Sequence, residues 1–243
     1  DYFETLFDVT TPCVGQVPVI CIDGPTASGK GTLSQGVAKA LGYAWLDSGA
    51  LYRLVGVAAE QAGLSTTVEA LADPAHAATV GELARNMAVR FEGEQVFLGG
   101  HDVSAAIRTE AAGMGASRVS AIGPVRAALM DLQQGFVRAP GLVADGRDMG
   151  TVIFPHAPLK VFLTASAEKR AERRYRQLIS KGISANIDSL LADLKERDAR
   201  DTNRQHAPLK AATDAALLDN TDLGIEESVQ QVLSWWQSKQ RKT

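Results

Sequence analysis

Five short stretches of this 243-residue chain are almost wholly apolar, and segments with helical spacing separate them. They lie at residues 17–23, 43–46, 141–144, 159–163 and 216–219. Apolar runs of this length, without alternating polar positions, are typical of parallel strands buried on both faces. The pattern predicts an α/β fold with a doubly wound parallel sheet, which binds its ligand at the carboxyl ends of the strands.

Helix start signals follow several of these strands. Ser48 and Ser166 are expected as N-caps, and Pro124 stands near the first turn of another helix. The last helix has apolar residues at helical spacing that should pack into the core. The helices expected from these signals cover about 126–138, 167–181 and 225–239.

A segment between about residues 75 and 107 interrupts the alternation of strand and helix patterns along the chain. Residues 87–91 and 95–98 flank the sequence Glu92-Gly93-Glu94, which predicts an antiparallel hairpin. Insertions at the binding edge of a sheet commonly carry substrate contacts or lids. We therefore expect a small antiparallel region inserted beside the parallel core.

Composition narrows the class of protein. With 45% hydrophobic residues the chain can build a core, so disorder is not expected. A net charge of −3 gives no global basic field, and we expect no nucleic-acid partner. No apolar run approaches the roughly 20 residues that span a bilayer, and no secretory signal opens the chain. No membrane partner is expected.

The two cysteines, Cys13 and Cys21, form no C-x-x-C pair, which argues against zinc and redox sites and fits a reducing cytoplasm. Cys21 is expected to be a small buried hydrophobe. The four histidines are scattered, and none pairs with a Ser or Cys nucleophile in a recognisable pattern. Acyl-transfer chemistry therefore has no support.

The stretch 24–32, with the sequence G-P-T-A-S-G-K-G-T, follows the first strand and precedes a helical pattern. Backbone N–H groups of such a loop curl around an anion at a helix N-terminus, and Lys30 adds a cation for the outer phosphates. The pattern G-x-x-x-x-G-K-[ST] is met up to its last position, where Gly31 stands before Thr32. A purely structural turn is the alternative. Strand, loop and helix in this order predict a nucleoside triphosphate site.

Charged residues follow two other strands. Arg53 lies one turn into the helix after Asp47 and could clamp a phosphate, although an ordinary exposed helix arginine is the alternative. Asp145 directly follows a buried strand, where a carboxylate can hold Mg²⁺ through water. Arg147 lies between Asp145 and Asp148, so a structural ion-pair cluster is the other interpretation of that motif.

Two further helices should each carry charged residues on one face. A linker at 180–184 joins them, which predicts a mobile lid that brings guanidinium groups over phosphates and excludes water. Surface salt bridging, such as Glu196 to Arg200, is the alternative. The same-face sets are Arg170, Arg173 and Arg174 upstream, and Arg197, Asp201 and Arg204 downstream.

With these motifs the chain resembles the bacterial cytidylate kinases, which are nucleoside monophosphate kinases, over about residues 17–240. Four segments carry the resemblance: I-D-G-P-T-A-S-G-K-G-T, L-D-S-G-A-L-Y-R, A-D-G-R-D-M-G-T-V-I-F-P and K-E-R-D-A-R-D-T-N-R. The second and third are specific to that family. The resemblance implies transfer of the γ-phosphoryl group of ATP to CMP or dCMP, with Mg²⁺.

The resemblance also implies roles for particular residues. ATP would be held by Gly24, Pro25, Thr26, Ala27, Ser28, Gly29, Lys30, Gly31 and Thr32, with Arg173 from the lid. The acceptor would be held by Ser48, Arg53, Ser117, Arg126, Arg147, Asp148, Arg197, Asp201 and Arg204. Catalysis would rest on Lys30, Arg147, Arg173, Arg197 and Arg204, and the metal on Thr32 and Asp145.

Within the acceptor set, Asp148 is expected to accept from the amino group of cytosine and to repel a uracil carbonyl. Arg53, Arg147 and Arg204 would grip the acceptor phosphate. Asp201 would bind the sugar hydroxyls.

Two other functions stay open on the sequence: a broader UMP/CMP kinase, and a P-loop nucleotide-binding switch without acceptor chemistry. The guanine-specific N-K-x-D motif is absent, which argues against the switch. We expect a monomer with CMP, dCMP and ATP as its ligands. The expected layout is a flexible extension over 1–16, a core over 17–47, 108–165 and 205–240, a monophosphate-binding region over 48–107 and a lid over 166–204.

Overall fold

The computed structural model describes residues 17–92 and 95–241, so the expected extension over 1–16, Cys13 and the hairpin turn Gly93-Glu94 lie outside the described residues. A five-stranded parallel sheet forms the centre, in the order β2-β6-β1-β7-β8. All five predicted strands are confirmed to within two residues. They are β1 Val19–Asp23, β2 Ala44–Asp47, β6 Leu142–Gly146, β7 Leu159–Thr164 and β8 Ala216–Asp219.

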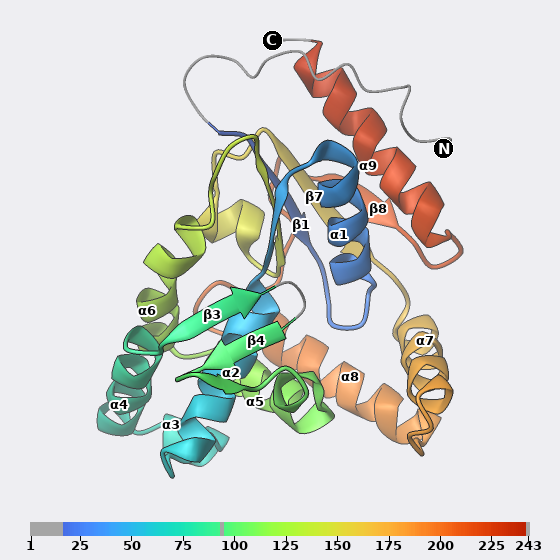
Figure 1. Ribbon diagram of the computed structural model, residues 1–243. Coiled ribbons are helices and arrows are strands. Elements are labelled where there is room, and N and C mark those ends of the chain that lie inside the picture. Colours follow the sequence, from blue (N-terminus) through green and yellow to red (C-terminus); the bar gives the residue numbers. More distant parts are fainter. Residues whose placement is uncertain (1–16, 93–94, 242–243) are drawn as a thin grey trace.

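The sheet is covered on both faces, as a doubly wound fold requires, because successive side chains of a strand point to opposite sides. Ile20 and Ile22 pack against α1 and α9, whereas Val19 and Cys21 pack into the core on the side of α2 and α6. Cys21 is buried, as the sequence predicted. These helices are α1 Lys30–Leu41, α9 Ile225–Gln240, α2 Ser48–Gln61 and α6 Gly123–Gln134 (Figure 1).

The predicted hairpin is confirmed as part of a three-stranded antiparallel sheet, whose third strand the sequence did not reveal. Short helices and α5 surround it, and α2 packs extensively on α5. These elements form the lower left of Figure 1. They are α3 Val68–Leu71, α4 Pro74–Arg85, β3 Val89–Glu92, β4 Gln95–Leu98, β5 His101–Asp102, the 3-10 turn η1 Ala106–Arg108 and α5 Glu110–Val119.

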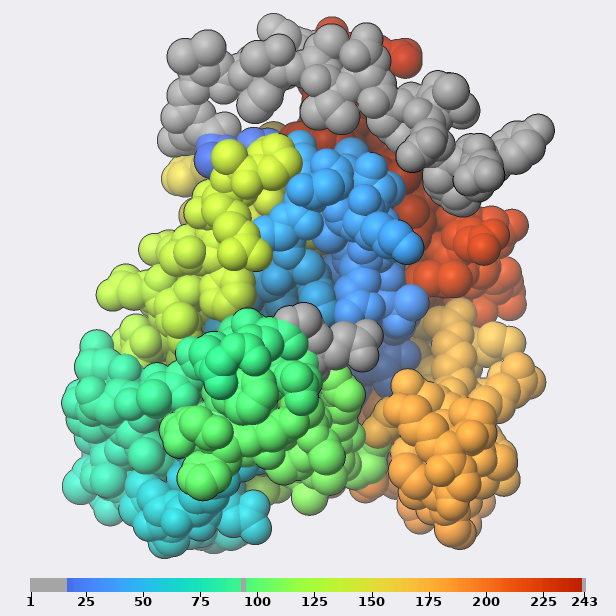
Figure 2. Space-filling view, in the orientation of Figure 1, coloured from blue at the N-terminus to red at the C-terminus, as the bar shows by residue number. Residues whose placement is uncertain are grey.

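A helical hairpin of α7 Ala167–Ser180 and α8 Ile187–Asn203 stands beside this body, at the lower right of Figure 1. Ser166 caps α7 by accepting from Lys169 N at 3.2 Å, as predicted. The space-filling view shows this hairpin at the lower right, adjoining the region that contains α5 (Figure 2). Throughout the described ranges, no helix is both long and apolar enough to cross a membrane.

Three predicted boundaries were wrong. Ser48 is not an N-cap: Asp47 caps α2 by accepting from Ala50 N at 3.0 Å, and Ser48 is the first helical residue. Helix α6 ends at Gln134 rather than at residue 138, since Gly135 follows and glycine disfavours helix. Arg204 lies beyond α8 in extended conformation, so it does not share that helix face.

Candidate active site

The phosphate loop adopts a backbone that its glycines permit. A Cβ on Gly24 would lie 2.6 Å from the Leu163 carbonyl oxygen, and Gly29 has a left-handed φ of 87°. Ala27 is also left-handed, with a φ of 56°, a conformation that residues other than glycine rarely adopt. Helix α1 then starts at Lys30 without a side-chain cap or a first-turn acid. Its free N–H groups and positive dipole end form an anion-binding position.

A cavity of about 170 Å³ lies at this carboxyl edge of the sheet. The register pairs Asp23 with Gly146, so the phosphate loop and the segment after β6 leave the sheet side by side. Five cations and three carboxylates reach its wall: Lys30, Arg53, Arg147, Arg197, Arg204, Asp47, Asp145 and Asp148. Thr26, Ala27, Gly31, Ser48, Gly49, Tyr52, Ala116, Ser120 and Gly146 complete the lining.

The cations are crowded. Burial, followed by repulsion from Arg147 and Arg53, lowers the pKa of Arg197 to about 10. Burial, followed by repulsion from Arg126, similarly lowers the pKa of Arg204 to about 10. Burial is also the main cause that lowers the pKa of Lys30, with Arg147 next. Positive groups that destabilise one another in a buried cavity create a strong potential for a polyanion.

Other predicted residues lie behind the wall, where they pair with one another. Asp201 is fully buried and accepts from Arg147 and from Ser117 Oγ, the latter at 3.2 Å. Arg126 pairs with Asp148 and donates to the Ser120 carbonyl at 2.9 Å. Arg147 and Asp148 therefore pair with distant residues, and the local ion-pair cluster weighed for this motif does not form.

The region of the cavity around Tyr52 contains polar groups that the sequence did not single out. Tyr52 lines it under the Arg126 guanidinium, which lies 5.4 Å from the ring centroid. The Tyr52 hydroxyl is buried without a hydrogen-bond partner of normal geometry, and burial raises its pKa to about 12. Beside it, Ser48 Oγ donates to Gln133 Oε1 at 2.8 Å.

Asp145 lines the cavity close to Lys30, and Trp45 Nε1 donates to its Oδ2 at 2.7 Å. Burial raises the pKa of Asp145 and Asp47 adds to the rise, whereas Lys30 opposes it. Buried Asp145 and partly exposed Asp47 are neighbouring carboxylates that repel each other, and their hard oxygen donors fit a divalent cation such as Mg²⁺. Thr32 is exposed and does not line the cavity. Among the described residues, no group of three or more His, Cys, Asp or Glu could hold a metal by itself.

Asp23, at the end of β1, ties the two substrate loops together. Its oxygens accept from Met149 N and Gly150 N, both at 2.9 Å, at the start of the π-helical turn η2 Met149–Ile153. Burial raises the pKa of Asp23 to about 7, although both backbone hydrogen bonds oppose the rise. The acid follows directly on an apolar strand, and no sequence signal indicated that its partners lie over 100 residues away.

The helical hairpin also contacts the phosphate loop. Arg170 of α7 donates to the Thr26 carbonyl at 3.0 Å and pairs with Asp198 of α8. Arg173 lies outside the cavity and donates to Asn220 Oδ1 at 3.1 Å, while Asn220 Nδ2 donates to the Ser28 carbonyl at 2.8 Å. Asn220 thus joins α7 to the phosphate loop, a link that the sequence did not reveal.

A second contact joins the hairpin to α5, where Arg174 donates to Glu110 at 2.6 Å.

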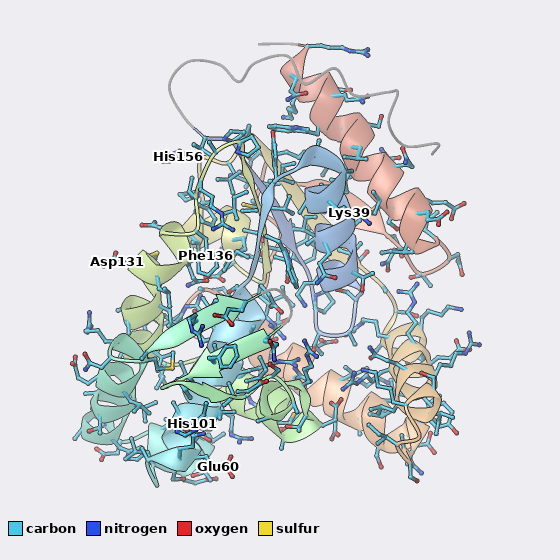
Figure 3. All side chains as sticks on the ribbon, in the orientation of Figure 1. Lys39, Glu60, His101, Asp131, Phe136 and His156 are labelled. Carbon is cyan, nitrogen blue, oxygen red and sulfur yellow. The ribbon has the colours of Figure 1, made fainter. Side chains whose placement is uncertain are left out.

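The labelled histidines His101 and His156 lie at opposite ends of the molecule, away from this region (Figure 3). The remaining predicted loop residues Gly24, Pro25, Ser28 and Gly29 shape the loop backbone without lining the cavity.

Taken together, the parallel sheet, the phosphate loop at its carboxyl edge and the cationic cavity beside a helical hairpin define a P-loop kinase. Comparison with known proteins narrows this class: the family model described as cytidylate kinase matches residues 20–238. The chain belongs to the cytidylate kinase family, whose members use ATP as phosphoryl donor and act on nucleotides.

Several curated relatives are similar over nearly their whole length. A protein of Cupriavidus necator named cytidylate kinase is 57% identical over 221 residues, which cover 90% of this chain and 96% of that protein. A cytidylate kinase of Bordetella bronchiseptica is 56% identical over 224 residues, covering 92% and 97% of the two chains. A cytidylate kinase of Polynucleobacter asymbioticus is 53% identical, covering 91% and 97%.

Proposed function

We propose that this protein transfers the γ-phosphoryl group of ATP to CMP or dCMP, giving ADP and CDP or dCDP. The observation that carries the proposal is the cavity, in which Lys30 of the phosphate loop and four arginines meet beside polar groups that could hold a base. Phosphoryl transfer needs positioning and positive charge far more than covalent help, and the cavity has groups for both.

On the donor side, the loop from Gly24 to Thr32 would hold the ATP phosphates with its backbone N–H groups, and Lys30 would reach the outer ones. On the acceptor side, Arg53, Arg147, Arg197 and Arg204 would grip the acceptor phosphate. Support comes from their shared cavity and from the lowered pKa values of Arg197 and Arg204, which a dianion would restore.

Arg173 would reach the transferring phosphoryl only after leaving Asn220, so we propose that the hairpin moves as a lid. Ser117 and Asp201 would similarly exchange one present contact for the ribose hydroxyls. Arg126 would hold Asp148 toward the base. The layout of core, monophosphate-binding region over 48–107 and lid over 166–204 belongs to this proposal.

Asp145, with Asp47 beside it, would hold Mg²⁺ through water, and Thr32 remains a second predicted metal residue. The bound ion would neutralise charge on the ATP phosphates. We also propose that the enzyme works in the cytoplasm, since its substrates belong to the free nucleotide pool. We propose in addition that it is a monomer.

The test is ADP release measured in parallel with CMP, dCMP, UMP, AMP and GMP as acceptors, with ATP and Mg²⁺. We expect turnover confined to CMP and dCMP, and loss of turnover in Lys30→Ala. Comparable rates with UMP would favour the broader UMP/CMP kinase. If no acceptor leads to ADP release although ATP binds, the result would favour a P-loop nucleotide-binding switch and overturn the proposal.

A further inference from the structure

Gln133 is a fully buried amide on the inner face of α6. Asp131, two residues earlier, points away from the sheet on the outer side of the same helix (Figure 3). Gln133 Nε2 donates to the Leu129 carbonyl at 3.2 Å, and its Oε1 accepts from Ser48 Oγ at 2.8 Å. The side chain therefore joins α6 to the first residue of α2.

The two contacts fix the direction of the amide. The Leu129 carbonyl can only accept a hydrogen bond, so the NH₂ end of Gln133 must face it and the oxygen must face Ser48. A serine hydroxyl has one proton and two lone pairs. Since that proton is committed to Gln133, Ser48 offers only acceptor lone pairs to the cavity that it lines.

Asp148 lines the same cavity and also presents acceptor oxygens, since its carboxylate pairs with the Arg126 guanidinium. An exocyclic amino group carries two N–H donors, which two acceptors can satisfy. An oxo group in the same place has none, and it would leave both acceptors buried and unpaired.

We propose that Gln133 is a specificity-determining positioning residue: by holding the Ser48 proton, it makes the Ser48 hydroxyl an acceptor and so selects 4-amino over 4-oxo pyrimidine nucleotides. The inference rests on the proposed function for the position of the acceptor base. It adds a second discriminating acceptor to Asp148, set by a residue that does not itself line the cavity.

The alternative is that Gln133 only packs the interface between α6 and α2. The two interpretations differ when the amide oxygen is removed. In Gln133→Met the Ser48 hydroxyl is free to rotate and donate to an oxo group, so UMP should gain while CMP loses. A packing role alone would weaken both nucleotides alike.

The experiment measures the Kd of CMP, UMP and ATP by calorimetry, together with kcat/KM for both acceptors. Variants are Gln133→Met, Gln133→Glu, Ser48→Ala and the double variant Ser48→Ala/Gln133→Met. Gln134→Met is the matched control, since Gln134 is the exposed neighbour and its amide donates to the Ile153 carbonyl instead. Circular dichroism and thermal unfolding verify that each variant is folded.

We expect the CMP-to-UMP affinity ratio to fall about tenfold in Gln133→Met, with ATP affinity unchanged. Gln133→Glu, which in its neutral form can both donate to Leu129 and accept from Ser48, should retain most of the ratio. In the Ser48→Ala background, Gln133→Met should have no further effect on the ratio, because the group on which it acts is gone.

Three outcomes would overturn the inference. They are equal weakening of CMP and UMP in Gln133→Met, an equal fall in the CMP-to-UMP affinity ratio on adding Gln133→Met to the wild type and to Ser48→Ala, and equal affinities for CMP and UMP in the wild type. If Gln133→Met does not fold, Ser48→Ala decides: a loss confined to CMP supports the proposal and a loss common to both contradicts it. Failure of the proposed function is separate, since the wild type would then bind CMP without releasing ADP.

Discussion

At the scale of single residues, Asp23 connects the two halves of the active site. Its carboxylate leaves β1 just before the phosphate loop and accepts two N–H groups from the turn that follows Asp148. The orientation of Asp148 and the path of the phosphate loop therefore depend on one buried side chain. Because the carboxylate is desolvated, its charge state is sensitive to pH close to neutrality.

Asp23→Asn should change how stability depends on pH. The folded pKa of about 7 exceeds the ordinary 3.8, so the stability linked to the bound proton is full below about pH 3.8 and lost as the pH rises through about 7. Between pH 5 and 8, wild-type stability should fall relative to Asp23→Asn by about 1–3 kcal/mol, as urea unfolding would measure. Asp145 and Lys30 also titrate in both proteins and interact with Asp23, so the difference between the two proteins includes the change in these interactions. A constant difference across this range would contradict the expectation.

At the scale of elements, the strands of the parallel sheet and the helices expected around it followed from the sequence, whereas α3, α4, α5 and β5 were not predicted. The start of α2 and the end of α8 were misplaced because a helix end depends on which side chain finds a partner. Asp47 accepts from Ala50 N, and Arg204 turns to the Ala207 carbonyl at 2.6 Å. Strand β5 has only two residues and gives no periodic signal.

The α7–α8 hairpin depends on Arg170, which is buried and contacts both Asp198 and the phosphate loop. Arg170→Met should destabilise the protein by about 2–4 kcal/mol because it leaves Asp198 unpaired. This loss corresponds to a Tm about 5–10 °C lower in calorimetry. The KM for ATP should also rise, since the Thr26 carbonyl loses a donor.

Arg176→Met is the control on the same helix. The Arg176 side chain is 73% exposed and pairs only with Glu172 one turn away, so its removal should change stability by less than about 0.5 kcal/mol. Equal Tm values for the two variants would show that Arg170 does not hold the hairpin.

At the scale of the whole molecule, the sequence predicted which backbone segments form the site better than it predicted the side-chain contacts within the site. Residues at strand ends, such as Lys30, Asp145 and Arg147, meet in one cavity because parallel strands share a carboxyl edge. Arg173 and Asp201 lie outside that cavity. Spacing gives a helix face, but it does not give the distant partner to which a long side chain turns.

Both nucleotides should stabilise the whole molecule. At 100 times its Kd, a nucleotide that binds only the folded state contributes about 2.7 kcal/mol, or a Tm rise of about 5–10 °C. In Lys30→Ala, the shift from ATP should disappear while the shift from CMP remains, as thermal unfolding with each nucleotide alone would measure. Loss of both shifts would place Lys30 in a shared structural role.

Trp45 is the only tryptophan of the chain outside α9, and its indole N–H donates to Asp145 at the phosphate site. Trp235 and Trp236 lie in α9 and pack in the same core cluster as Trp45, but the buried indole N–H of Trp236 has no hydrogen-bond partner among the described residues. The emission of an indole responds to charge near its N–H group, whereas tryptophans remote from that charge give a constant background. We therefore expect the protein to carry its own optical reporter: the fluorescence of Trp45 should change when a cation or a phosphate binds beside Asp145.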